Sequence, residues 1–159
     1  MDNSSHSFNL YRLQQRLFPV LLGWALGSIA TGLFWIKNQD GSVAGFGSQF
    51  ASWGAVDLIL ALFGLQGARR NIARQVQGEI SPAQHARQAG IFERLVGLNA
   101  GLDLGYIAAG AWLAGTPVSM PQKRPGFRSG IGWGIMVQGA FLLVWDLLLA
   151  LLVHWRRKA

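Results

Sequence analysis

The sequence predicts an all-α membrane protein with four transmembrane helices, arranged as a tandem (parallel) repeat of two helical hairpins. Three observations lead to this fold class. Four segments are each apolar and long enough to cross a bilayer, which takes about 20 residues. Only 13% of the 159 residues are charged and 51% are hydrophobic, whereas an average soluble domain is about 25% charged. The second pair of apolar segments also resembles the first. We therefore expect one integral membrane domain over residues 1–159.

The four predicted spans lie at residues 17–36, 46–65, 95–115 and 131–155. The first is too long for the apolar region of a signal peptide and lacks a small-residue cleavage site followed by a polar chain. Ser81 and Pro82 predict a helix start, because a serine N-cap followed by proline at the first helical position is favourable. No residue from there to 115 breaks a helix, so the third span should carry an amphipathic lead of about three turns.

Basic residues are divided unequally between the two predicted faces of the membrane. Ten of the 14 Lys and Arg residues lie near the chain termini or between spans two and three, and four lie in the other two loops. Because cytoplasmic loops carry the excess of Lys and Arg, both termini should be cytoplasmic. We expect a multi-pass protein of the inner (plasma) membrane, with Trp35 and Trp155 near the lipid headgroups.

The chain repeats itself in two registers. Residues 45–62 match residues 134–151 at eight of 18 positions, and residues 16–32 match residues 94–110 at eight of 17. The first match pairs Gln49 with Gln138 and Asp57 with Asp146, which chance matching of Leu and Ala does not explain. Repeat one should therefore cover about 10–67 and repeat two about 84–157. Two hairpins of equal orientation would be related by an axis along the membrane normal.

Small residues at four-residue spacing predict close helix packing. Span three carries such a ridge, and span one carries a shorter one. We expect these ridges to pack within the chain, although a contact between copies in a homo-oligomer is the alternative. The ridge residues are Gly97, Gly101, Gly105 and Ala109 in span three, and Gly23 and Gly27 in span one.

Polar residues near the middle of the spans are the candidate functional residues. An aspartate at a helix centre costs about 2.5–3.5 kcal/mol on insertion scales, so intramembrane acids are functional candidates by default. No Lys, Arg or His lies at comparable depth in the sequence, so the carboxyls must be protonated, bind a cation or meet a basic partner subunit. The alternative is a structural hydrogen bond between helices. The candidates are Asp57, Asp146, Asp103, Asn99, Gln49 and Gln138.

Other functional classes have little support in the sequence. The net charge of +7 could indicate nucleic-acid binding, but the basic residues flank apolar segments instead of lining one soluble face, so we expect no nucleic-acid partner. Cysteine is absent from the sequence, which excludes thiol catalysis and thiolate metal sites. No two histidines face each other at depth, and no catalytic motif is visible. We therefore expect no cofactor, no metal site and no enzymatic activity.

Two functions remain. The first is proton- or cation-linked transport or permeation, with Asp57 and Asp146 as a titrating pair, Gln49 and Gln138 on the outer approach, and Asp103 with Asn99 as an asymmetric third site. The second is a non-catalytic accessory or assembly subunit of a larger membrane complex, whose buried acids pair with a partner's basic residues. In both cases the expected partners are the lipid bilayer and either a second copy or another membrane protein.

Overall fold

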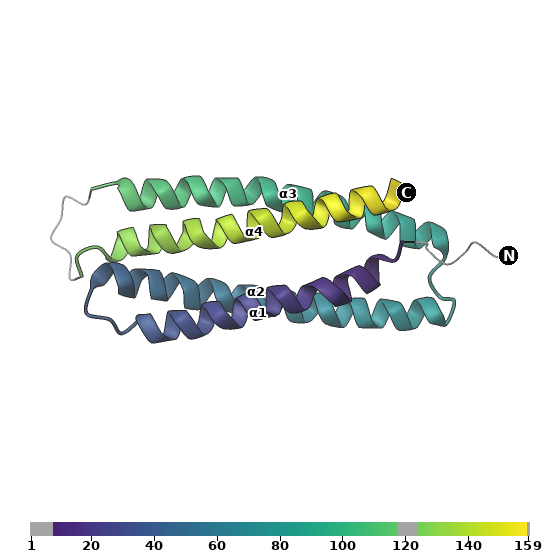
Figure 1. The fold of residues 1–159 in the computed structure, drawn as a ribbon, viewed down its shortest axis with the longest axis horizontal. Helices are drawn as coiled ribbons and strands as arrows, with labels where there is room; N and C mark the ends of the chain where they lie inside the picture. Colours follow the sequence, from purple (N-terminus) through teal and green to yellow (C-terminus); the bar gives the residue numbers. More distant parts are fainter. Residues whose placement is uncertain (1–7, 118–123, 159) are drawn as a thin grey trace.

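The computed structural model describes residues 8–117 and 124–158, and all regular secondary structure in this part of the chain is α-helical. The prediction of an all-α chain with four helices is therefore confirmed. Figure 1 shows them as a long, narrow bundle in which the helices run side by side. The helices are α1 (Leu10–Trp35), α2 (Gly41–Val76), α3 (Pro82–Gly115) and α4 (Phe127–Lys158).

Side-chain caps fix the first residues of three helices. The Asn9 side chain accepts a hydrogen bond from the backbone N–H of Arg12 at the start of α1. The Asp40 carboxylate accepts from two backbone N–H groups at the start of α2. Ser81 and Gln84 form a reciprocal capping box at the start of α3, so the helix start predicted there is confirmed. These caps satisfy N–H groups that have no partner within a helix.

The helices pack in the order α1, α2, α4, α3. Helices α1 and α2 form one hairpin, α3 and α4 form a second, and the hairpins meet where α2 packs on α4. We call the end at which α2 and α4 begin the hairpin end, and the end at which α1 and α3 begin the terminal end. In Figure 1 the purple start of α1 and the yellow end of α4 lie together at the terminal end.

The surface of the bundle is apolar, and several polar groups are buried instead. Leu33, Phe34 and Phe63 are exposed, whereas the carboxyls of Asp57 and Asp103 are buried. This pattern is the reverse of a soluble bundle and agrees with lipid around the helices. Helices α1, α2 and α4 are long and apolar enough to cross a membrane.

Helix α3 is long enough to cross a membrane, but it is not among the helices that are also apolar enough. Asn99, Asp103 and four glycines within residues 97–110 lower its hydropathy. The structure therefore supports association with a membrane through three helices, and the crossing of α3 stays a prediction.

Glycines close the contacts between helices, but at positions other than the predicted ridges. A Cβ added at Gly110 of α3 would lie 2.7 Å from the carbonyl oxygen of Gly132 in α4. A Cβ added at Gly32 of α1 would lie 2.6 Å from the carbonyl oxygen of Gly47 in α2 and closer still to the backbone nitrogen of Ala51. Backbones can approach in this way only where no side chain intervenes.

The prediction that the small-residue ridges pack within the chain is wrong. A Cβ added at Gly97, Gly101 or Gly105 would meet no atom within 4 Å, and the same holds for Gly23 and Gly27. All five, with Ala109, are exposed on the surface of the bundle. Helical spacing fixes which residues share a face, but it does not fix which way that face points. The ridges therefore point outward.

Candidate functional site: an acidic cavity between the helices

A cavity of about 400 Å³ lies between the four helices. Phe18 and Leu21 of α1 border it, together with residues from about two turns of α2, about two turns of α4 and about four turns of α3. It is lined chiefly by apolar and aromatic side chains, and a small set of polar groups converges on it. That combination is typical of pockets for small ligands. The polar residues are Asp57 of α2, Asn99 and Asp103 of α3, and Asp146 of α4.

The three aspartates therefore converge on one site, a point that the sequence leaves open. Asp57 is 1% exposed, Asp103 3% and Asp146 8%. The sequence match between residues 45–62 and 134–151 aligns Asp57 with Asp146, and they lie on the two helices that join the hairpins. Asp103 comes from α3 and has no counterpart in α1, where Ala25 takes its place. The cavity thus has an approximately paired part and one additional carboxyl.

Two carboxylate oxygens in this cavity lack a partner. Asp57 Oδ2 and Asp103 Oδ2 are buried and accept no hydrogen bond from any described residue. Asn99, from the turn of α3 before Asp103, lines the same cavity but is itself exposed. A buried polar atom without a partner costs free energy comparable to a lost hydrogen bond, so a hydrogen-bond donor is missing at both of these cavity-lining residues.

No basic side chain balances these acids within the described part of the chain. The residues lining the cavity include no Lys, Arg or His. The ion pairs found in residues 8–117 and 124–158 join Arg74 to Glu79, and Glu93 to both His154 and Arg157. In the same ranges, no three His, Cys, Asp or Glu side chains lie close enough together to hold one metal ion.

A second, smaller pocket of about 190 Å³ adjoins the acidic cavity toward the hairpin end. Gln49 and Gln138 line it, and these two residues are equivalent in the two hairpins. Trp53 and Tyr106 line both pockets. Their rings meet edge to face with centroids 5.3 Å apart. This aromatic pair therefore borders the acidic cavity on one side and the glutamine pocket on the other.

Gln138 is held by α1. It is 1% exposed, and its Oε1 accepts a hydrogen bond of 2.7 Å from Nε1 of Trp24. The Trp24 ring stacks on Phe141 of α4 with centroids 3.8 Å apart. The amide nitrogen of Gln138 has no partner among the described residues. Gln49 is only half-buried, so the two equivalent glutamines differ in their surroundings.

The aromatic side chains are the part of the site that sequence reasoning missed. Trp53, Trp145 and Tyr106 line the acidic cavity, but tryptophan in a membrane helix more often anchors the interface or fills the core. One signal was available for Tyr106, which follows Asp103 by three residues and so lies on the same helix face. Trp145 directly precedes Asp146, and nothing in its spacing distinguishes it from a packing residue.

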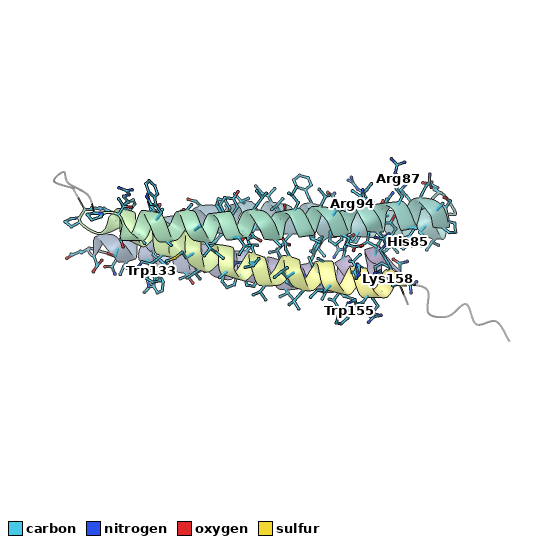
Figure 2. The ribbon with its side chains drawn as sticks, turned by 90° about the horizontal axis from the view of Figure 1, so that it is seen from above. His85, Arg87, Arg94, Trp133, Trp155 and Lys158 are labelled. Carbon is cyan, nitrogen blue, oxygen red and sulfur yellow. The ribbon has the colours of Figure 1, made fainter. Side chains whose placement is uncertain are left out.

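The terminal end is fastened by hydrogen bonds between α1 and α3. The Tyr11 hydroxyl of α1 donates a hydrogen bond to Gln88 of α3. The backbone N–H of Leu10 donates to Nε2 of His85 at 3.1 Å. Burial lowers the pKa of His85, which stabilises the neutral ring that can accept this bond. In Figure 2 the labelled His85 and Lys158 lie at this end and Trp133 lies toward the other.

An ion-pair cluster lies beside these contacts. The Glu93 carboxylate of α3 contacts His154 at 2.7 Å and also pairs with Arg157, both from α4. These bonds, first that from His154, lower the pKa of Glu93. Arg87 and Arg94 of α3 also lie toward the terminal end (Figure 2). The terminal end is thus the more basic and the more polar end of the bundle.

Comparison with known proteins gives one match. Comparison with curated proteins and with solved structures finds no similar protein. One family model matches residues 20–147, which is most of the chain and includes all the residues named above as candidates in the two pockets. The description of that family assigns no activity, substrate or partner. The chain belongs to DUF6992, a family of unknown function.

Proposed function

We propose that this protein is a four-span membrane protein that moves protons or a small cation across the bilayer, using the aspartates of the acidic cavity. One observation carries the proposal: three buried carboxyls from three helices line one cavity, and none of the described residues around it is basic. Carboxyls in such surroundings are neutralised by a proton or by a bound cation. Exchange between these two states is the elementary step of proton- or cation-linked transport.

The proposal requires that α3 also crosses the membrane. Its 34 residues span about 51 Å at 1.5 Å per residue, more than the ~30 Å of hydrocarbon. It packs along α4 as α1 packs along α2, which supports a common depth in the bilayer. Its Asp103 is buried where it lines the cavity and so avoids lipid, although Asn99 beside it is exposed.

The orientation follows from the charges and aromatic residues at the two ends. The basic terminal end is proposed to be cytoplasmic, at the inner (plasma) membrane, which leaves both chain termini on that side. Trp155 lies near that end and is exposed. At the hairpin end, Trp112 and Trp133 are exposed, and the Arg128 guanidinium lies 5.3 Å from the centre of the Trp112 ring. Such aromatic side chains favour the headgroup level.

Matching environments support the proposed duplication of a helical hairpin, with repeat one about 10–67 and repeat two about 84–157. Gly32 and Gly110 are equivalent by sequence, and both contact the backbone of their hairpin partner. The open ridge glycines of α1 are equivalent to two open ridge glycines of α3. The paired glutamines share one pocket and the paired aspartates share the other.

In this mechanism the cargo enters from the hairpin end through the glutamine pocket. Gln49 and Gln138 offer amide groups on that approach. The cargo then passes the Trp53–Tyr106 pair, which borders both pockets. Asp57 and Asp146 exchange protons or cation as a coupled pair. Asp103 and Asn99 supply the third, unpaired site. No catalytic step is part of the proposal.

The test is proton or cation flux in liposomes containing the purified protein. Asp57→Asn and Asp146→Asn should each reduce the flux toward that of protein-free liposomes, because the amide keeps the shape but loses the titrating group. Glu79→Gln is the matched control, since it removes a carboxylate whose side chain is 51% exposed and outside the cavity. Equal flux in all variants, or no flux of any cation tested, would exclude this function.

A second candidate is an accessory or assembly subunit of a larger membrane complex. The observation that favours it is the outward-facing ridge of Gly97, Gly101 and Gly105, which would admit a second helix at close range. Leucine at these positions should then release a partner, or a second copy of this chain, during purification in mild detergent. A single species that is unchanged by the leucine variants would argue against it.

A further inference from the structure

The size of the acidic cavity limits what it can hold. Its volume of about 400 Å³ compares with about 30 Å³ for one water molecule in the liquid. It falls within the range of about 300–1,000 Å³ found for small-molecule pockets. A proton needs no such space, and a bare metal ion would leave most of it unfilled. The cavity is therefore large enough for an organic molecule of several non-hydrogen atoms.

The walls of the cavity suit an organic cation better than a hydrated metal ion. Calcium and magnesium ions require six or more oxygen ligands, and magnesium gives up its water reluctantly. Aromatic side chains line the cavity together with the carboxyls, among them Trp53, Tyr106 and Trp145. Aromatic faces attract a cation, most strongly where water is excluded. An organic cation can contact these rings with its apolar body, while its charged nitrogen exchanges water for the carboxyl oxygens.

The unpartnered oxygens indicate what the cation must carry. Asp57 Oδ2 and Asp103 Oδ2 are buried and accept no hydrogen bond from any residue that the structure describes. They belong to different helices, and the two residues that carry them line the same cavity. A ligand with at least two N–H groups on one charged nitrogen can donate to both. A quaternary ammonium has the charge but no N–H group to donate.

We propose that the acidic cavity binds a small primary or secondary organic ammonium ion, with its N–H groups on Asp57 and Asp103 and its apolar body against Trp53, Tyr106 and Trp145. This inference rests on the proposed function and names the class of cargo for the same site. Asp146, the paired acid, then completes the negative surroundings. Hydrogen bonds between an ammonium and buried carboxylates are of the strong, charge-assisted kind.

The experiment is calorimetric titration of the protein in lipid nanodiscs with three matched probes: benzylammonium, benzyl alcohol and benzyltrimethylammonium. Empty nanodiscs supply the partition background. Benzylammonium should bind to one site. Benzyl alcohol, which lacks the charge, and benzyltrimethylammonium, which lacks the N–H groups, should each bind at least about ten-fold more weakly. Equal binding of all three probes would overturn the proposal.

Variants then locate the site. Asp57→Asn and Asp103→Asn should each weaken benzylammonium binding by about 10- to 150-fold, the range for a hydrogen bond to a charged group. Trp53→Leu leaves the carboxyls in place and should weaken it by about 2- to 30-fold through the lost aromatic face, so it tests the site even where an aspartate variant does not fold. Glu79→Gln should leave binding unchanged. Unchanged affinity in Trp53→Leu and in every folded aspartate variant would show that the probe binds elsewhere and would overturn the proposal.

Binding and flux separate this inference from the function on which it rests. Aspartate-dependent proton flux without benzylammonium binding would overturn the inference and leave the proposed function intact. Aspartate-dependent binding without flux of protons, metal cations or benzylammonium would support the site and overturn transport as its role.

Discussion

The glycine contacts between α3 and α4 allow a stability difference to be worked out for two substitutions in one helix. Gly110→Ala adds a Cβ that would lie 2.7 Å from the carbonyl oxygen of Gly132 and 3.0 Å from the amide nitrogen of Met136. Gly101→Ala, made nine residues earlier in α3, adds a Cβ that meets no atom within 4 Å. Both substitutions make the same chemical change in the same helix, so they differ only in their surroundings.

The magnitudes follow from these distances. Ordinary contact begins near 3.4 Å, so the two helices must separate by about 0.7 Å at Gly110. Because the obstacle is backbone, no side-chain rotation relieves it. A gap of this size forfeits a quarter to a half of the dispersion energy of the atoms it separates, and overpacking typically costs about 1–3 kcal/mol. Alanine in place of glycine in a helix gains up to about 1 kcal/mol. Both variants share this gain, so Gly110→Ala should be less stable than Gly101→Ala by about 1–3 kcal/mol. Gly101→Ala itself should be neutral or stabilising by up to about 1 kcal/mol.

The assay is reversible unfolding of the purified protein in mixed micelles, followed by helical circular dichroism. If Gly110→Ala were as stable as Gly101→Ala, the close backbone contact between α3 and α4 would be refuted. If Gly101→Ala were destabilised as strongly as Gly110→Ala, the outward direction of the glycine ridge would be refuted. In that case another helix must cover the ridge, either from a partner or from a second copy.

Three further predictions concern the polar contacts between helices. Burial depresses the folded-state pKa of His85 below 6.5, so the free energy of unfolding should be greatest above pH 6.5 and should fall as the pH drops through the folded-state pKa. Protonation of the ring also removes the acceptor for the Leu10 N–H. His85→Gln should flatten the dependence of the melting temperature on pH. Glu93→Gln removes both ion pairs to α4. Because these partners are partly exposed, the variant should lose less than about 1 kcal/mol of unfolding free energy in the same assay, and the loss should disappear in high salt. Trp24→Phe keeps an aromatic ring but leaves the buried Gln138 Oε1 without its donor and should cost about 1–3 kcal/mol; no loss of stability in detergent would contradict the buried hydrogen bond.

The helices could be predicted from the sequence because their signals are local. A run of apolar residues and a serine before a proline each act within a few residues, and the capping box at Ser81 appears where that pair predicts it. The third span is weaker, since Asn99 and Asp103 lower the hydropathy of α3. The role of α3 depends on the cavity that Asn99 and Asp103 line, and this cavity forms only when the helices pack together.

The direction of each helix face could not be predicted in the same way. Four-residue spacing shows that Gly97, Gly101 and Gly105 share a face. It does not distinguish a face that packs on a neighbour from one that points outward, because both are made of small, uncharged residues. In a membrane an apolar residue is equally acceptable in lipid and in the core, so hydrophobicity carries little information about rotation.

The convergence of the aspartates depends on the same missing information. Spacing relates Asp57 to Gln49 within α2 and Asp146 to Gln138 within α4, but it cannot bring one pair to the other. The repeat supplied the strongest hint, since equivalent residues of a two-fold arrangement lie around one axis. It gave no hint of Asp103, which lacks a counterpart in the first hairpin. The sequence predicts Asp103 as a third site, but only the packing places it and the aromatic side chains in one cavity with the other two carboxyls.

The two ends of the bundle are fastened by different kinds of contact, and this difference determines which end can open. At the hairpin end, a Cβ at Gly45 of α2 would collide with the backbone of Phe127, and one at Gly130 of α4 with the backbone of Ser42, so the two hairpins touch through main chain that cannot rotate away. At the terminal end they are joined by side chains, including the Tyr11 hydroxyl and the His85 ring. Side-chain bonds break by rotamer changes, whereas backbone contacts separate only if whole helices move. The hairpin end is therefore the rigid end of the bundle, whereas the terminal end is held by contacts that side-chain rotation can release, and the cavity lies between the two.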